Sequence, residues 1–213
     1  MLGIYGCGGM GREIAELARR IGRWQGIIFI DDRPGDREVD RVKVFTLEEA
    51  GKKFKAKGLE VIISVGEPAT RKALAAKVAA ARLQSARVIA PGFELSPTST
   101  VAPGTLIHSG VVATCNVHIA EGCLINKLAV IGHDVTIGSF SVISPHVAIG
   151  GGTRIGPGCF LGSGALIRDG VNIGPGAIIG MGAVVLSDVE RDAVMVGNPA
   201  RFLRENRDKK ALR

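Results

Sequence analysis

An apolar residue recurs at every sixth position along the second half of the chain. From Leu95 to Val185 the register holds without an insertion, and Ala113 is the one position in it that is not Ile, Leu or Val. The residue four places further on is small or β-branched from Ser99 to Thr153, while Gly, Pro, Asn and Asp gather between, as tight turns require. This period predicts a parallel β-helix, in which three hexapeptides form one coil and residues 18 apart stack in columns.

Residues 1–94 follow a different pattern, in which apolar strand-like runs alternate with helical spacing. Strands are expected at 2–5, 27–30 and 59–65, with 87–89 as a further candidate, and helices at 13–20, 46–57 and 68–83. Thr46 and Glu49 form a capping box, and Pro68 suits a first helical turn. The alternation predicts a parallel sheet with flanking helices. We therefore divide the chain into a Rossmann-like α/β half domain (1–94), an all-β parallel β-helix (95–200) and a basic C-terminal tail (201–213).

Composition narrows the class of protein. Glycine is 30 of 213 residues and aromatic residues are 4%, so Ile, Val, Leu and Ala must build the core, and an apolar fraction of 46% excludes a wholly disordered chain. No run of about 18 apolar residues predicts a membrane span, and no signal-peptide pattern opens the chain. Four cysteines without a CxxC spacing favour reduced thiols, and hence a cytoplasmic protein. The net charge of +7 lies largely in the tail, which leaves too little to predict nucleic-acid binding.

A glycine loop, Gly6-Cys7-Gly8-Gly9-Met10-Gly11, follows the first strand and opens the first helix. Backbone N–H groups in such a loop can meet a diphosphate at the helix N-terminus, and Asp31 lies 20 residues after Gly11, where a dinucleotide fold binds ribose. An NAD oxidoreductase is thus one alternative. It rests on the loop alone, because fewer than 95 residues precede the β-helix and no hydride-transfer site is apparent. A tight turn that binds nothing is the other alternative.

The whole chain resembles the PglD/NeuD-type sugar acyltransferases of the left-handed β-helix hexapeptide-repeat superfamily. The residues that carry the resemblance are the glycine loop, Asp31-Asp32, Val65-Gly66 with Arg71, Ile131-Gly132-His133-Asp134, and Val196-Gly197-Asn198-Pro199-Ala200-Arg201. The resemblance covers residues 2–203. It implies a left-handed β-helix, a homotrimer, and transfer of acetyl from acetyl-CoA to an amine or hydroxyl of a sugar, often a nucleotide-linked amino sugar.

His133 is the residue to which the resemblance assigns catalysis. An imidazole with an ordinary pKa near 6.5 suits a base that takes a proton from an attacking amine or hydroxyl. Asp134 follows it, and in the family the acid at this place orients the ring. A corner position on the β-helix should point His133 outward, into a groove between subunits. The alternative is an exposed structural histidine at a turn.

The resemblance also implies a binding site for the sugar nucleotide. Its residues are Gly8, Gly9, Met10, Asp31, Asp32, Gly66, Arg71 and Asn126. Three positions depart from the family pattern: relatives usually carry His at Met10 and Thr at Lys127, and many carry a second His at Val142. The alternative for Asn126 is a corner residue that bonds its own backbone.

Acetyl-CoA is the implied co-substrate, held mainly by backbone. The matching positions are Gly150, Gly151, Ser163, Gly180 and Met181. Gly151 stacks one coil after His133, where backbone N–H groups could stabilise a developing oxyanion. The alternative is that these are ordinary corner residues. The basic tail could touch the phosphates of CoA or simply be solvated.

The remaining histidines and cysteines receive no catalytic role. His108, His118 and His146 are expected to be solvated or at an interface, and without a ligand-like spacing we predict no metal. Cys123 and Cys159 fall on the inward register and are expected in the core. Cys115 stacks one coil before His133, which leaves a Cys–His pair as a minor alternative.

The sequence thus predicts an acetyl-CoA-dependent N-acetyltransferase that acts on a nucleotide-linked amino sugar by direct transfer, with UDP as the expected nucleotide and His133 as general base. Two alternatives stay open: a sugar O-acetyltransferase of the sialic acid type, and a trimeric nucleotide-sugar-binding module with weak catalysis.

Overall fold

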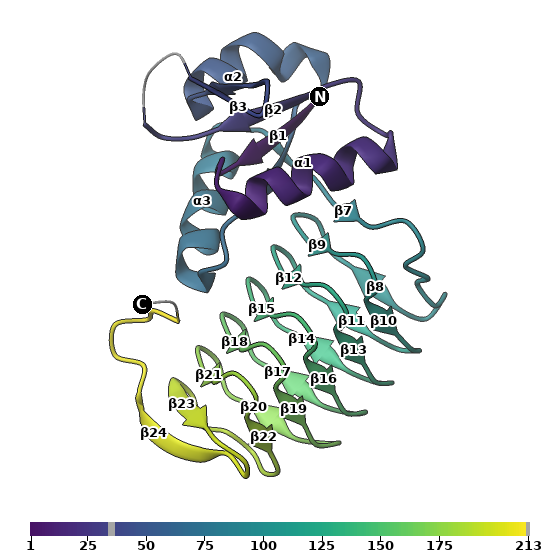
Figure 1. Ribbon diagram of the computed structural model, residues 1–213, viewed down its shortest axis with the longest axis vertical. Coiled ribbons are helices and arrows are strands. Elements are labelled where there is room, and N and C mark those ends of the chain that lie inside the picture. Colours follow the sequence, from purple (N-terminus) through teal and green to yellow (C-terminus); the bar gives the residue numbers. More distant parts are fainter. Residues whose placement is uncertain (34–36, 212–213) are drawn as a thin grey trace.

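The computed structural model describes residues 1–33 and 37–211, which form an α/β domain seated on a parallel β-helix (Figure 1). The coils of the β-helix stack away from the α/β domain, and the last strands close its far end. Among the described residues, no helix is long and apolar enough to cross a membrane.

The α/β domain is built on a sheet with the strand order β3-β4-β2-β1-β5-β6. Strand β1 (Leu2–Tyr5) runs parallel to β2 (Ile27–Ile30) on one side and to β5 (Glu60–Ile63) on the other, and β6 (Gln84–Ser85) extends the sheet. The predicted strands and helices of this half are confirmed, which gives the Rossmann-like arrangement expected from the alternation.

Three helices flank the sheet, and their ends follow from the sequence. Helix α1 (Gly9–Ile21) ends at Gly22, whose φ of 68° is the left-handed conformation typical of a helix stop. Helix α2 (Leu47–Phe54) begins with the predicted capping box, in which Glu49 N donates to Thr46 Oγ1 and Thr46 N donates to Glu49 Oε2. A 3₁₀ turn (Lys55–Lys57) follows, and helix α3 (Pro68–Ala80) starts with proline in its first turn.

A short hairpin was absent from the sequence-based expectations. It pairs β3 (Arg37–Val39) with β4 (Val42–Phe45), and β4 then joins β2 at the edge of the sheet. The turn residues Asp40 and Arg41 both have positive φ values, of 50° and 61°. Such turns usually carry Asn-Gly or Asp-Gly, so Asp-Arg gave no turn signal.

The second half of the chain is a parallel β-helix with two-residue strands in three sheets. Sheet 1 contains β10 (Val112–Ala113), β13 (Val130–Ile131), β16 (Ala148–Ile149), β19 (Leu166–Ile167) and β22 (Val184–Val185). Sheet 2 contains β8 (Thr100–Val101), β11 (His118–Ile119), β14 (Thr136–Ile137), β17 (Arg154–Ile155) and β20 (Asn172–Ile173). Sheet 3 contains β7 (Val88–Ile89), β9 (Leu106–Ile107), β12 (Leu124–Ile125), β15 (Val142–Ile143), β18 (Phe160–Leu161), β21 (Ile178–Ile179) and the terminal strands β23 (Ala193–Val196) and β24 (Arg201–Glu205).

The six-residue register is the inward face of this β-helix, as predicted. Ile125 pairs with Ile143 and Ile143 with Leu161, each 18 residues further on. Cys123 and Cys159 are fully buried among these side chains, and burial raises their pKa values to about 11 and about 12. They are therefore core residues, as expected.

The ends of the β-helix differ in detail from the simple period. Leu95 is 40% exposed and does not begin the β-helix. The first coil begins at β7, where Ile89, six residues before Leu95, pairs with Ile107 of β9. Sheet 3 thus begins before residue 95, where the sequence placed the domain boundary. At the other end, the segment predicted as a tail starts with β24, which pairs antiparallel with β23.

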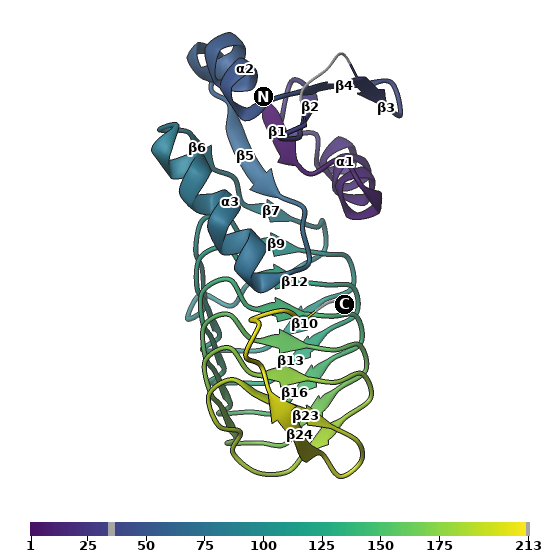
Figure 2. The same cartoon turned by 90° about the vertical axis from the view of Figure 1, so that its left-hand side faces the viewer.

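An apolar face joins the two domains. Leu106, Leu124 and Val142 point outward from sheet 3 and are nevertheless buried, because they pack in one cluster with residues of the α/β domain such as Ile14. Helix α3 runs down beside the first coils (Figures 1 and 2). The α/β domain therefore covers the outer face of the first coils of sheet 3 (Figure 1).

Arg71, predicted to bind substrate, lies in this junction instead. Its side chain has no solvent exposure, and its guanidinium donates to the carbonyls of Ile63 and Val65 in one domain and of Gly122 and Cys123 in the other, at 2.9–3.4 Å. Burial lowers the pKa of Arg71 to about 10, so it stays charged at neutral pH. The substrate assignment of Arg71 is wrong for this reason: every face of the group is taken by protein.

We expect Arg71→Ala to lower the free energy of unfolding by roughly 3 kcal/mol, because it leaves buried carbonyls without donors and opens a cavity. Urea denaturation measures this loss. Lys72→Ala, one residue along the same helix but exposed, is the control and should change stability by less than about 0.5 kcal/mol. Equal stability of the Arg71 variant and the wild type would show that the junction does not depend on this group.

Candidate active site

The β-helix has three corners, and each carries a different set of predicted residues. The Asn126 corner (126–129 and its equivalents in other coils) links sheet 3 to sheet 1, the His133 corner (132–135) links sheet 1 to sheet 2, and the Pro157 corner (156–159) links sheet 2 back to sheet 3. Because the α/β domain packs on sheet 3, it borders the Asn126 and Pro157 corners. The His133 corner lies on the opposite edge of the prism.

His133 and Asp134 form a hydrogen-bonded pair on an exposed corner. Nδ1 of His133 lies 2.7 Å from Oδ2 of Asp134, and the two side chains are 66% and 54% exposed. Asn116, one coil earlier, donates from Nδ2 to Oδ1 of Asp134 at 2.9 Å. The bonds from His133 and then Asn116 hold the pKa of Asp134 below its usual range, so the carboxylate is charged. Since a carboxylate can only accept, Nδ1 carries a proton, and in the neutral ring the lone pair is therefore on Nε2.

Gly151 lies directly against this imidazole. A Cβ at Gly151 would sit 2.6 Å from Nε2 of His133, so the ring covers the glycine and turns its free nitrogen toward that backbone. Gly152 N donates to His133 O at 2.7 Å, which fixes the stacking of the two coils. The predicted column is therefore present. The N–H of Gly151 donates to Oδ1 of Asp169 at 2.8 Å, one coil further along the same column.

The glycine loop has the geometry of an anion-binding turn. Gly6 has a φ of 109°, and a Cβ at Gly11 would overlap the carbonyl oxygen of Gly6, so both positions require glycine. Gly8 and Gly9 face open space and make no side-chain cap for α1. The first N–H groups of α1 therefore face a region that a ligand can enter.

Asp31 and Asp32 lie beside this loop at the carboxyl edge of the sheet. Cys7 Sγ donates to Asp31 at 3.2 Å, and Arg33 pairs with the same carboxylate at 3.1 Å. Asp32 accepts a hydrogen bond from Tyr5 and one from Lys77 at 2.5 Å, and these bonds, that of Lys77 first, lower its pKa. Gly66 follows β5 at the same edge.

At the junction of α1 with the Asn126 corner, Asn126 Oδ1 accepts the N–H of Lys127. This local bond resembles the structural alternative for Asn126, although the left-handed residue of this corner is Leu128. Lys127 Nζ reaches across the junction to Glu13 Oε2 of α1 at 2.7 Å, a pair that no sequence motif marked. Met10 is partly buried against the same apolar cluster. Val142, where many relatives carry histidine, is 2% exposed under the α/β domain.

His108 lies in this junction and is not solvated. It is 3% exposed, and its Nε2, 3.8 Å from Glu13 Oε2, has no hydrogen-bond partner among the described residues. Burial first, and the charge of Lys127 next, lower its pKa, so it is neutral. Of the two expectations for this residue, the interface is the correct one.

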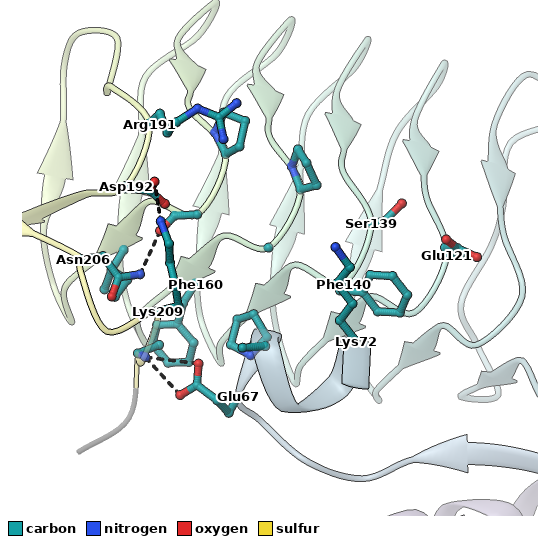
Figure 3. A pocket seen from close by; sticks show the side chains of 18 residues that line it. Glu67, Lys72, Glu121, Ser139, Phe140, Phe160, Arg191, Asp192, Asn206 and Lys209 are labelled. Carbon is teal, nitrogen blue, oxygen red and sulfur yellow. Dashed lines mark hydrogen bonds and ion pairs between the residues drawn. The ribbon is translucent and has the colours of Figure 1, made fainter. Parts of the chain in front are cut away.

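A well-formed cavity of about 540 Å³ lies elsewhere, on the Pro157 corner (Figure 3). Phe140, Phe160 and Ile178 line it beside the start of α3, and the C-terminal segment closes it, with Ala211 N donating to Glu67 at 3.0 Å. None of the predicted site residues lines this cavity. The final residues of the predicted basic tail, 212 and 213, lie outside the described residues.

Comparison with known proteins identifies the family. The family model of the PglD N-terminal domain matches residues 1–78, and that of the bacterial transferase hexapeptide repeats matches 116–151 and 152–187. The acetyltransferase domain of PglB from Neisseria gonorrhoeae in complex with acetyl coenzyme A is 29% identical with a TM-score of 0.89, covering 95% of this chain and 98% of that one. PerB from Caulobacter crescentus, in complex with CoA and GDP-perosamine, is 28% identical with a TM-score of 0.87, covering 95% and 97%.

This chain belongs to the PglD-type sugar acyltransferases of the hexapeptide-repeat superfamily. It is therefore an acetyltransferase that uses acetyl-CoA, and its β-helix is left-handed. WeeI from Acinetobacter baumannii, at 24% identity and a TM-score of 0.71, shares the fold. A search of curated proteins with this sequence found no match. An acetyltransferase thus replaces the NAD oxidoreductase that the glycine loop left as an alternative.

The positions predicted for acetyl-CoA lie on two corners of this PglD-type chain. Gly150 and Gly151 are on the His133 corner, whereas Ser163, Gly180 and Met181 are on the lower coils of the Asn126 corner, where Met181 is 80% exposed. A single chain therefore does not bring them together. In the described part of the chain, no group of three or more His, Cys, Asp or Glu side chains could hold a metal ion.

Gly151→Ala should lower kcat about 100-fold while the protein stays folded. The new Cβ pushes the exposed His133 ring aside, and misplacing a catalytic group by about 1 Å costs that much. Acetyl transfer and a thermal melt measure the two effects. Gly132→Ala is the contrast: its Cβ would meet the backbone N of Gly151 at 2.7 Å, so it should lower stability as well. Full activity of Gly151→Ala would show that the ring does not act from its place over this glycine.

Proposed function

We propose that this acetyltransferase transfers acetyl from acetyl-CoA to the amine of a nucleotide-linked amino sugar, with His133 as general base. The observation that carries the proposal is the His133–Asp134 pair, whose Nε2 is free and faces Gly151, in a chain that matches PerB over nearly its full length. PerB is described with CoA and GDP-perosamine, and a related structure as a perosamine N-acetyltransferase.

In the proposed reaction the acceptor amine arrives unprotonated near Nε2 of His133. Its lone pair forms the C–N bond to the thioester carbonyl carbon, the C=O π electrons move onto oxygen, and Nε2 takes the N–H proton. The N–H of Gly151 is the nearest donor for the oxyanion. Collapse re-forms C=O and breaks the C–S bond, and the departing thiolate takes the proton from His133. The products are an amide and the free thiol of CoA.

The separation of the corners supports a homotrimer. His133, Gly150 and Gly151 occupy one corner, while Asn126, Ser163, Gly180 and Met181 occupy another that borders the α/β domain. A cyclic assembly with heterologous contacts sets the His133 corner of one subunit against the Asn126 corner of the next. The groove between them would then hold acetyl-CoA.

The acceptor nucleotide is proposed to bind at the carboxyl edge of the α/β sheet. Gly8 and Gly9 offer N–H groups to its diphosphate, Met10 and Gly66 flank the loop, and Asp31 and Asp32 accept from ribose or base. The sequence favoured UDP, whereas the Caulobacter relative is described with a GDP sugar. Lys77 and Tyr5 already hold Asp32 in place for such a contact.

His133→Ala should keep the trimer and lower kcat by about 10²- to 10⁴-fold, the usual worth of a general base. Asp134→Asn should cost less, since it removes orientation but leaves the ring. His118→Ala, also an exposed histidine of the β-helix, is the control and should be fully active. Release of free thiol from acetyl-CoA reports turnover, and light scattering should give three times the 22.2 kDa chain mass. An active His133→Ala enzyme would place the base elsewhere, and a monomeric wild type would contradict the shared site.

Asp32→Ala should raise KM for the nucleotide sugar about tenfold with little change in kcat, because it removes a contact shared by the ground and transition states. Calorimetry with UDP, GDP and CoA separately should show weaker binding of the preferred nucleotide and unchanged binding of CoA. Glu48→Ala, an exposed acid on α2, is the control. Loss of CoA binding in Asp32→Ala would contradict the division of ligands between the two domains.

A further inference from the structure

Three consecutive backbone N–H groups, those of residues 150–152, lie one coil after His133, and one of them differs from its neighbours. Gly150 N donates to the carbonyl of Ile167 at 2.9 Å, and Gly152 N donates to that of His133 at 2.7 Å. Gly151 N donates to a side chain, Oδ1 of Asp169, at 2.8 Å. A main-chain acceptor cannot leave without unwinding a coil, whereas a side chain can rotate away. Of these three groups, the N–H of Gly151 is therefore the one that can become a hydrogen-bond donor to a ligand.

The carboxylate of Asp169 lies tightly against the glycine pair. A Cβ at Gly150 would run into Oδ1 of Asp169, so the carboxylate reaches Gly151 N only because Gly150 lacks a side chain. Asp169 is exposed, and the N–H of Gly151 is the one hydrogen-bond partner of its carboxylate in the described part of the chain. An exposed carboxylate with a single bond has little that holds it in place.

The same N–H is the donor that the proposed reaction requires. In that reaction the attacking nitrogen lies near Nε2 of His133, whose ring packs against Gly151, and the N–H of Gly151 is the donor assigned to the thioester oxygen. An anionic oxygen of Asp169 already occupies that position. The oxyanion of the proposed tetrahedral intermediate would therefore compete with this carboxylate for the same N–H.

We propose that Asp169 is a positioning residue that fills the oxyanion position in the free enzyme and turns aside when acetyl-CoA binds. This inference rests on the proposed function. Asp169 keeps the Gly151 N–H satisfied and correctly aimed until the acyl group arrives. Displacing Asp169 from this N–H requires free energy, and only a ligand with a carbonyl oxygen at this position has to displace it.

The free energy of displacing Asp169 lowers the affinity for acetyl-CoA but not the affinity for CoA. CoA has no thioester oxygen, so it binds without displacing Asp169, while acetyl-CoA competes with the carboxylate for one N–H. Because kcat/KM compares the transition state with the free enzyme, the cost also lowers kcat/KM for acetyl-CoA.

The test compares Asp169→Ala with Asp188→Ala. Oδ1 of Asp188 accepts the N–H of Asn172 at 2.8 Å, so this exposed acid makes the same kind of contact away from His133. Calorimetry with CoA and with the non-reactive ketone analogue of acetyl-CoA, which keeps the carbonyl, is run beside steady-state kinetics. In Asp169→Ala we expect the analogue to bind about three- to tenfold more tightly, CoA to bind as before, and kcat/KM for acetyl-CoA to rise by a similar factor. Asp169→Asn should lie between, since a neutral amide oxygen is a weaker acceptor.

Three results would overturn the inference. An unchanged ratio of analogue to CoA affinity in Asp169→Ala would mean that the carboxylate only provides a hydrogen-bond acceptor for the N–H of Gly151 and does not compete with the acyl group. A fall in kcat/KM would mean that the carboxylate assists the reaction, and an equal rise in Asp188→Ala would mean that any such contact has this effect. The affinity ratio remains measurable even if no amino sugar is acetylated, so failure of the proposed function and failure of this inference give different results.

Discussion

Backbone hydrogen bonds between residues in successive coils are the interaction on which the rest of this structure depends. They hold neighbouring coils at the spacing of paired strands, so each side chain must fit the one 18 residues before it. In the interior, Ile125 therefore stacks on Ile143, and Ile143 stacks on Leu161. At the corner, it places the ring of His133 over Gly151, where any larger residue would displace it. The geometry of the proposed catalytic pair is thus a consequence of the same stacking that builds the core.

The position of the α/β domain decides how the site can be assembled. Leu106, Leu124 and Val142 make the outer side of sheet 3 apolar, and the domain covers that face. Arg71 adds a buried cation that bonds carbonyls on both sides of the junction. As a result the proposed nucleotide-binding edge and the Asn126 corner belong to one side of the prism and His133, the proposed base, to another. A second subunit is the simplest way to bring base and acceptor together.

Polar groups at the junction and at the corner have different consequences. Lys127 and Glu13 form an ion pair next to His108, whose buried ring is kept neutral by its surroundings. At the corner, Asp134 is charged because His133 and Asn116 bond to it, and that charge fixes which nitrogen of the ring is free. Asp169 uses the same chemistry on a backbone N–H. One corner thus carries two carboxylates in different contacts, Asp134 on the imidazole of the proposed base and Asp169 on the N–H of Gly151.

The sequence by itself determined the architecture of this protein. A period of six reports inward positions directly, and the capping box of Thr46 with Glu49 is a local bond, so both were legible without a structure. The His133–Asp134 pair was equally local. Arg71 was misjudged, because a motif match does not reveal that four carbonyls from two domains converge on one guanidinium. Asp169 lies 18 residues after Gly151, so the six-residue period already stacks these two positions. The contact of Lys127 with Glu13 instead joins residues of two different domains. Only the tertiary structure decides such contacts, because they depend on where two independently formed surfaces meet.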